Sequence, residues 1–184
     1  MNMHAPALSF AHDRRLAAVG VIGFVVALAA ASQIAIPLPG TPVPFTLQPM
    51  IVVLAGLMLG PTLGAASMML YLLVGAVGVP VFTPVGAPGI ARLLGPTGGY
   101  LIAYPFAAYA TGVLARRASS LGGRLGAALA GMVLIFLGGL AQLTVLTGSA
   151  SQAVAVGVTP FALFDVAKAF LAALIARPRR TARD

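Results

Sequence analysis

Long runs of apolar residues alternate along this chain with short segments rich in proline, glycine or arginine. A helix that crosses a bilayer needs about 20 largely apolar residues. Periodicity does not separate helix from strand inside such runs, so their length and their proline, glycine and charged boundaries decide the interpretation. The pattern predicts six membrane helices, of which the second is the shortest. They cover residues 16–36, 47–59, 63–80, 97–116, 125–147 and 160–177.

Three longer connections separate these predicted helices. The segments 37–46, 81–96 and 148–159 hold prolines, glycines or small polar residues, so each is expected to be a loop. Pro160 suits the first turn of the sixth helix, where a missing backbone N–H costs nothing.

The distribution of charge supports a membrane protein and gives it an orientation. Only 8% of the 184 residues are charged, against roughly a quarter in soluble domains. Most basic residues lie in three clusters that flank apolar runs, at 14–15, 116–124 and 177–183. Six helices put all three clusters on one face, which the positive-inside rule makes cytoplasmic. The net charge of +8 is therefore a topology signal rather than a nucleic-acid-binding surface.

This interpretation divides the chain into three parts. It predicts a cytoplasmic N-terminal tail at 1–15, a six-helix substrate-binding domain at 16–177 and a basic cytoplasmic tail at 178–184. An alternative is that Arg14, Arg15 and the following apolar run form a cleavable signal peptide. Cleavage would leave five spans and put the two ends of the chain on opposite faces.

Three charged residues lie outside the cytoplasmic clusters and tails. Arg92 falls in the second outer loop, and Asp165 and Lys168 lie near the outer end of the sixth helix. A charge at membrane depth costs on the order of 2.5–3.5 kcal/mol, so it usually faces a partner or a wet cavity. Asp165 and Lys168 share a helix face and could simply neutralise each other, and Arg92 could snorkel to the interface. Taken together, the three predict an outward-facing cavity of net charge +1 that suits a monoanionic solute.

Four ordered motifs resemble the BioY family, the biotin-binding S components of energy-coupling-factor (ECF) vitamin transporters. The resemblance runs from about residue 25 to residue 177. The motifs are "IPLPGTPVPFTLQ" (36–48), "GLMLGPTLGAASMMLYLLVGAVGVPVF" (56–82), "LLGPTGGYLIAY" (93–104) and "FDVAKAFLAALI" (164–175). The resemblance implies an all-α integral membrane protein with the ECF S-component fold, six transmembrane helices and both termini in the cytoplasm.

The resemblance also implies a biotin site built around Arg92, Asp165 and Lys168. Biotin is a monoanion with an apolar bicycle and a ureido group that has two N–H donors and one carbonyl. Asp165 would accept the ureido N–H groups, while Arg92 and Lys168 would share the carboxylate and the ureido oxygen. Other implied substrate-binding residues lie on the lid or around the ring. They are Thr46, Gln48, Tyr71, Phe82, Thr83 and Tyr100.

The resemblance implies that the protein binds biotin from outside with high affinity and mediates its uptake. It also implies a multi-pass protein of the bacterial inner membrane. No stretch has the phosphate-binding pattern of an ATPase. The resemblance implies separate partners, namely an ECF coupling protein and ATPase subunits. The small residues Gly23, Ala27 and Ala31 recur every four positions on the first helix. They would dock the coupling protein or, alternatively, pack within the chain.

Other function classes fit the residues less well. An enzyme would need a nucleophile–base pair or metal ligands at membrane depth, and the chain has no cysteine and no histidine beyond His12. Neither a metal nor another cofactor is therefore expected. A proton-coupled carrier would need Asp165 to titrate, but Lys168 should keep it ionised. A purely structural protein, an S component for another water-soluble vitamin and a solitary biotin transporter remain as alternatives.

Overall fold

The structure, a computed structural model, describes residues 14–176. Within this range the regular structure is helical, apart from one antiparallel bridge between Ile36 and Phe45. The helices are α1 (Arg14–Gln33), α2 (Gln48–Leu59), α3 (Pro61–Ala76), α4 (Ala91–Leu94), α5 (Gly98–Ala115), α6 (Leu121–Thr147), α7 (Ala150–Gly157) and α8 (Ala162–Ile175). The described part of the chain is thus all-helical, as the sequence predicts.

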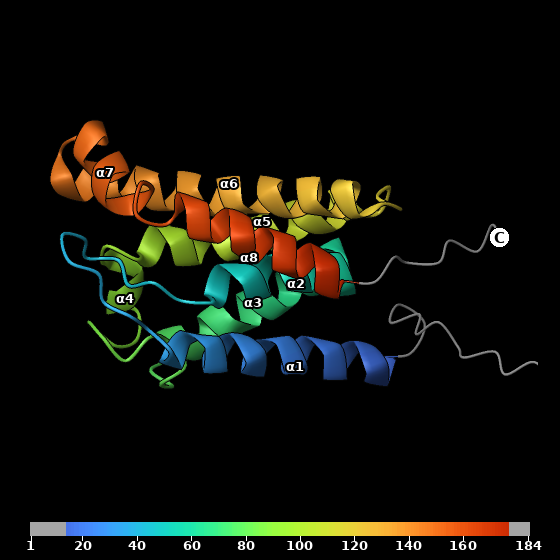
Figure 1. The fold of residues 1–184 in the computed structure, drawn as a ribbon. Helices are drawn as coiled ribbons and strands as arrows, with labels where there is room; N and C mark the ends of the chain where they lie inside the picture. Colours follow the sequence, from blue (N-terminus) through green and yellow to red (C-terminus); the bar gives the residue numbers. More distant parts are fainter. Residues whose placement is uncertain (1–13, 177–184) are drawn as a thin grey trace, which may run out of the picture.

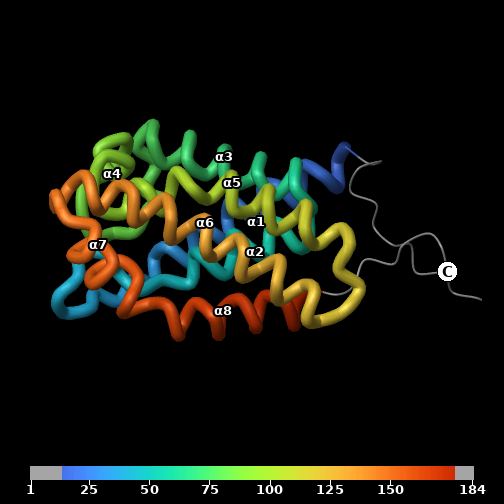
Figure 2. The backbone as a smooth tube through the Cα atoms, turned by 90° about the horizontal axis from the view of Figure 1, so that it is seen from above, coloured from blue at the N-terminus to red at the C-terminus, as the bar shows by residue number. Residues whose placement is uncertain are grey.

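The longer helices lie side by side in a bundle (Figure 1). Helix α5 is the central element and packs against α6, α3 and α2, while α8 packs against α2 and α6. Among the described helices, α1 packs against α2 and α3, and it forms one edge of the bundle in Figure 1. The short helices α4 and α7 are both at one end of the bundle (Figure 1 and Figure 2). The start of α1 and the end of α8 are at the opposite end.

Two helices are individually long and apolar enough to cross a membrane, namely α1 and α6. Helices α7 and α8 would count as a third span if taken together, although the chain bends by 54° between them. Helices α2 and α3 are apolar but shorter. The reversal between them occurs at Gly60, whose φ of +85° favours glycine, and Pro61 then begins α3 without needing a backbone N–H donor.

The predicted loops at 81–96 and 148–159 are wrong in one respect, because the first contains the four-residue helix α4 and the second contains helix α7. Gly148 ends α6 in a left-handed conformation, and the Ser149 hydroxyl then accepts a hydrogen bond from the Gln152 backbone N–H at 3.3 Å. This N-cap compensates for an unpaired donor at the start of a short helix. The prediction for Pro160 was also wrong, because α8 begins at Ala162 and the proline lies just before it.

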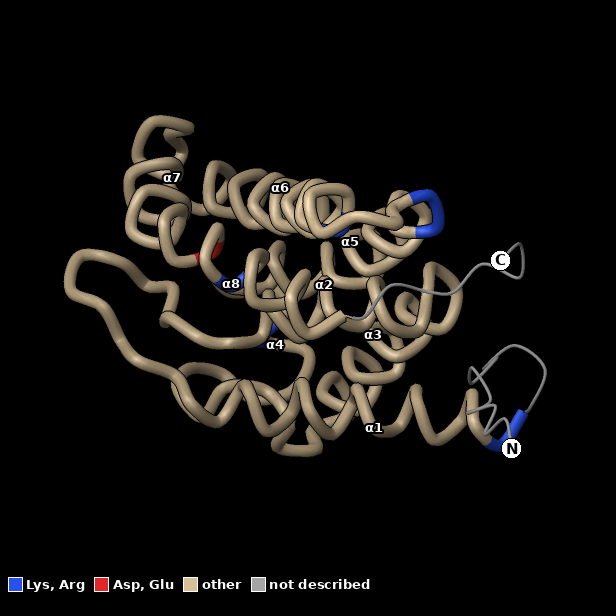
Figure 3. Tube along the Cα trace, turned by 45° about the vertical axis from the view of Figure 1, so that its right-hand side comes forward, with Lys and Arg blue, Asp and Glu red and all other residues tan. Residues whose placement is uncertain are grey.

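The basic residues of α1 and of the α5–α6 connection lie at one end of the bundle (Figure 3). Arg14 and Arg15 begin α1, and Arg116 and Arg117 follow α5. Asp165 and Lys168 lie on α8 towards the other end, within the half of the bundle that carries α4 and α7. Residues 1–13 of the predicted tail at 1–15 lie outside the described residues, whereas Arg14 and Arg15 begin α1. The predicted tail at 178–184 and both histidines also lie outside the described residues.

Candidate functional site

A cavity opens in the half of the bundle that carries α4 and α7. The space that it encloses, counted together with its open mouth, is about 610 Å³. The walls come from the 34–47 connection, the loop after α3, and helices α2, α5, α6 and α8. The lining residues are Val43, Pro44, Thr46, Gln48, Pro49, Phe82, Thr83, Thr97, Tyr100, Leu101, Tyr104, Ile135, Phe136, Phe161, Asp165 and Lys168.

Asp165 and Lys168 form an ion pair within this cavity. The Lys168 Nζ lies 2.6 Å from Asp165 Oδ1, and both side chains are less than a tenth exposed. Their spacing of three places them one above the other on the same face of α8. Removing either partner would leave a buried charge uncompensated. The cavity therefore contains one anion and one cation side by side, each with unused hydrogen-bonding capacity.

The connection between α1 and α2, residues 34–47, forms a flap over the cavity. Backbone hydrogen bonds between Ile36 and Phe45 pair its two arms, and the Thr41 hydroxyl donates to the Val156 carbonyl of α7 at 2.6 Å. Lys168 Nζ lies 4.0 Å from the centroid of the Phe45 ring, a cation–π distance. The ring also meets Phe164 edge-on, with centroids 5.4 Å apart. The flap is thus attached to both α7 and α8.

Phe45 was not among the predicted site residues, although it lies inside the 36–48 motif. Nothing in the sequence around this apolar residue indicates a contact with Lys168, more than a hundred residues away. Pro44 and Thr46 on either side of it line the cavity, so the flap alternates its side chains between the cavity and α8.

A buried hydrogen-bonded chain forms the base of the cavity on the α2–α3 side. The Gln48 side-chain amide donates to the Tyr71 hydroxyl at 2.8 Å, and that hydroxyl donates to the Val81 carbonyl at 2.9 Å. The Thr46 hydroxyl lies 3.4 Å from Gln48 Oε1. Thr46 and Gln48 line the cavity, whereas Tyr71 is fully buried behind them. Tyr71 therefore supports the wall rather than facing a ligand.

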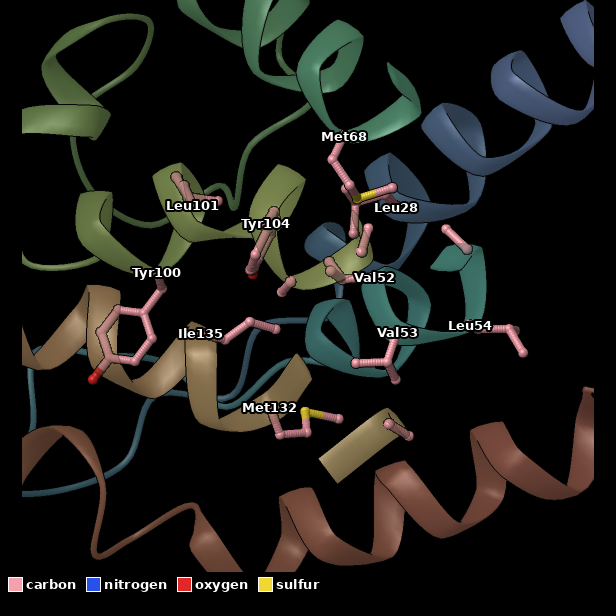
Figure 4. Close-up of a cluster of buried hydrophobic side chains, with 14 of the residues drawn as sticks. Leu28, Val52, Val53, Leu54, Met68, Tyr100, Leu101, Tyr104, Met132 and Ile135 are labelled. Carbon is pink, nitrogen blue, oxygen red and sulfur yellow. The ribbon is translucent and has the colours of Figure 1, made fainter. Parts of the chain in front are cut away.

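Two tyrosines of α5 line the opposite wall, and Figure 4 shows both projecting from α5 towards α6. The Tyr100 hydroxyl donates to the Gly157 carbonyl at 2.7 Å. Gly139 of α6 leaves room for the Tyr100 ring, since a Cβ at this position would collide with it. Tyr104 was not predicted as a site residue. Its spacing of four from Tyr100 would have indicated the same helix face.

Arg92 lies in α4 and is not among the residues that line the cavity. Its guanidinium donates to the backbone carbonyls of Thr83, at 2.6 Å, and of Val85. Its Nε is buried without a hydrogen-bond partner. Burial lowers the pKa of this guanidinium, but arginine remains protonated in proteins. Arg92 therefore stabilises the loop that contains Thr83 through hydrogen bonds to its backbone, although Arg92 itself does not line the cavity.

The predicted site residues consequently fall into two groups. The first group lines the cavity. Its members are Thr46, Gln48, Phe82, Thr83, Tyr100, Asp165 and Lys168. Tyr71 and Arg92 lie behind the wall and hold it through hydrogen bonds. Among residues 14–176 no group of three potential His, Cys, Asp or Glu ligands could hold a metal ion.

Residues 5–184 of the chain match the family model described as "BioY family". The chain belongs to the BioY family. The resemblance carried by the four motifs is therefore confirmed.

Members of the BioY family from distant organisms cover most of the chain. "Probable biotin transporter BioY" of Pyrococcus horikoshii is 40% identical over 153 residues, which is 83% of this chain and 89% of the relative. "Biotin transporter BioY" of Thermotoga maritima is 37% identical over 163 residues, or 89% and 94% of the two chains. These relatives are transporters and not enzymes, as the sequence analysis expected of this chain.

A solved structure has the same fold. It is the crystal structure of "the S-component for biotin from an ECF-type ABC transporter", with a TM-score of 0.82 and 27% sequence identity. The match covers 89% of this chain and 90% of the other. This BioY-family chain therefore has the S-component fold of a membrane transport protein.

Proposed function

We propose that this chain is the membrane subunit that binds biotin from outside and mediates its uptake. The observation that carries the proposal is the buried Asp165–Lys168 ion pair, which lines a cavity together with aromatic and hydrogen-bonding side chains. The two relatives from Pyrococcus horikoshii and Thermotoga maritima are named as biotin transporters, and the matching crystal structure is a biotin S component. The family and the chemistry of the cavity thus support the same ligand.

The polar groups of the cavity complement those of biotin. An ionised Asp165 only accepts hydrogen bonds, so it suits the two ureido N–H groups. Lys168 has three N–H donors and would take either the ureido oxygen or the carboxylate. Tyr100, Tyr104 and Phe82 offer aromatic surface to the apolar bicycle. Arg92 would reach the ligand only after its guanidinium had released the carbonyls of Thr83 and Val85.

The proposed topology has six membrane spans, formed by α1, α2, α3, α5, α6 and the α7–α8 pair. The basic residues at the start of α1 and after α5 support a cytoplasmic location for that end, and therefore for both termini. The cavity would then open to the outside, next to α4 and α7. The domain division proposed from the sequence follows, with the membrane domain at 16–177 between tails at 1–15 and 178–184.

Uptake would be energised by the ATPase and coupling subunits of an ECF-type transporter in the cell membrane. A cavity at one face does not by itself give access to the other side, so the subunit must move or change shape. Of the three small residues predicted to dock the coupling protein, Gly23, Ala27 and Ala31, the last is buried within the chain. We therefore place the coupling protein on α1 around Gly23 and the half-buried Ala27. Gly23 is exposed, and a Cβ there would meet no atom within 4 Å, which leaves room for a second helix.

The test is isothermal titration of the detergent-purified full chain with biotin. We expect one-to-one binding, weakened at least tenfold, or about 1.4 kcal/mol, in Asp165→Asn and in Lys168→Met. The double variant Asp165→Asn/Lys168→Met leaves no unpaired buried charge, so it separates loss of ligand contacts from loss of fold.

Either of two results would contradict this proposal. A folded wild-type chain that does not bind biotin would exclude the ligand. A double variant that binds biotin as tightly as the wild type would show that Asp165 and Lys168 are a structural pair only.

A further inference from the structure

Helix α1 is attached to the rest of the bundle mainly at its C-terminal end. Leu28, Ala31 and Ser32 are its fully buried residues, and all lie in its second half. The Ser32 side chain has no exposed surface. Its hydroxyl lies 2.7 Å from the Ala29 carbonyl of its own helix and 2.6 Å from the carbonyl of Val81. Val81 belongs to the loop after α3 that continues into the cavity wall.

The Val81 carbonyl also accepts the Tyr71 hydroxyl at 2.9 Å, and Tyr71 accepts the Gln48 amide at 2.8 Å. Gln48 lines the cavity. An unbroken series of hydrogen bonds therefore joins α1 to the cavity lining through one backbone carbonyl. Buried polar groups of this kind hold their partners firmly, because an unpaired group is costly away from water.

A second contact joins α1 to the same loop. The Gln33 side-chain amide donates to the Phe82 carbonyl at 3.1 Å and to the Ser32 hydroxyl at 2.9 Å. Phe82 and the following Thr83 line the cavity. The Phe82 ring packs edge-on against Tyr71, with centroids 5.4 Å apart. Two consecutive carbonyls of the cavity loop are thus held by two consecutive side chains of α1.

We propose that Ser32 and Gln33 are positioning residues. Through their hydrogen bonds to Val81 and Phe82, they make the closure of the ligand cavity depend on the position of α1 relative to α3. They do not line the cavity but hold Val81 and Phe82, and through them the wall at Phe82 and Thr83. A displacement of α1 relative to α3 would pull on this loop and release the ligand. The inference rests on the proposed function, because it makes the coupling protein's docking helix the element that controls biotin retention.

The structure provides a closely matched control for Ser32. Ser67 of α3 is equally buried, and its hydroxyl donates only to carbonyls of its own helix, those of Leu63 and Gly64. Ser32→Ala and Ser67→Ala remove the same buried hydroxyl, but only the first removes a bond to the cavity loop. A single hydrogen bond contributes about 1 kcal/mol, which corresponds to roughly a fivefold change in a rate or equilibrium constant.

The experiment measures dissociation of labelled biotin from the purified full-length chain, together with its melting temperature. We expect Ser32→Ala to release biotin about fivefold faster, while Ser67→Ala releases it at the wild-type rate. Ser32→Thr, which keeps the hydroxyl, should restore slow release. Equal dissociation rates for Ser32→Ala and Ser67→Ala would overturn the proposal.

A variant of Gln33 tests the same contact between α1 and the cavity loop if Ser32→Ala does not fold. The Gln33 side chain is exposed, and Gln33→Glu removes the N–H donor to Phe82 at nearly constant size. Gln152→Glu, at an exposed position of α7, adds the same charge elsewhere. Faster release in Gln33→Glu alone supports the proposal, and identical release in the two variants contradicts it.

A ligand-free measurement separates this proposal from the identity of the ligand. The chain has no cysteine, so Thr83→Cys places a single thiol in the cavity wall. Ser32→Ala in that background should speed its reaction with a water-soluble maleimide, and Ser67→Ala should not. This result would uphold the role of Ser32 even if the wild-type chain did not bind biotin. If Thr83→Cys reacted equally fast with and without Ser32→Ala, while the chain still bound biotin, the role of Ser32 would be refuted and the proposed ligand would stand.

Discussion

The α5–α6 pair and α1 use small residues in opposite ways. Along α5 and α6, Gly99 and Gly138 face each other, and a Cβ on either would collide with the backbone carbonyl of the other. The two helices therefore approach to backbone contact, as small residues allow in membranes. On α1, Gly23 meets nothing within 4 Å. The same residue type closes an interface in the first case and leaves a surface open in the second.

The difference shows that a small-residue pattern does not by itself identify a docking surface. Helix α5 is covered by α2, α3 and α6, so its glycines serve internal packing. Helix α1 packs on α2 and α3 only, and its outward face carries Val19, Ile22 and Val26. Within residues 14–176 no other element covers that face of α1, which leaves room for the proposed partner.

The largest expected effect comes from overpacking the α5–α6 contact. Gly138→Val should destabilise the chain by about 3 kcal/mol or more, since a backbone carbonyl cannot move aside as a side chain can. Gly126→Val on the same helix is the control, because a Cβ at Gly126 meets no atom within 4 Å. Thermal unfolding followed by size-exclusion chromatography in detergent compares the two. Equal melting temperatures would contradict the close approach of α5 and α6.

An intermediate effect is expected at the attached end of α1. Ala31 is buried there, so Ala31→Leu should cost about 1–3 kcal/mol through overpacking. The neighbouring Ala30 is exposed, and Ala30→Leu should leave the melting temperature almost unchanged. A melting temperature for Ala31→Leu equal to that of Ala30→Leu would mean that α1 is held elsewhere.

The smallest effect on stability, and the most selective one on transport, is expected at Gly23. Gly23→Leu should change neither the melting temperature nor biotin affinity, because the position lies away from both the bundle core and the cavity. If α1 docks the coupling protein, the added side chain should abolish biotin uptake in cells that carry the complete transporter. Normal uptake by a well-expressed Gly23→Leu variant would remove α1 as the docking helix.

Local patterns in the sequence predicted most of the helices. The bounds of α2, α5 and α8 fall within a few residues of the predicted ones, since charge, proline and glycine punctuate the chain directly. The spacing of Asp165 and Lys168 likewise predicted that they share a face, because three residues make nearly one helical turn. The small polar residues of 148–159 hid α7, whose start depends on the Ser149 cap.

The sequence alone determined that this is an apolar helical chain with three charged residues outside its basic clusters and tails, because hydropathy and charge are properties of consecutive residues. Only the tertiary structure decided what each charge meets. Lys168 faces both Asp165 and Phe45, whereas Arg92 turns to the carbonyls of Thr83 and Val85. The link from Ser32 to Val81 spans 49 residues. Such contacts depend on how helices pack in three dimensions, and no spacing along the chain encodes them.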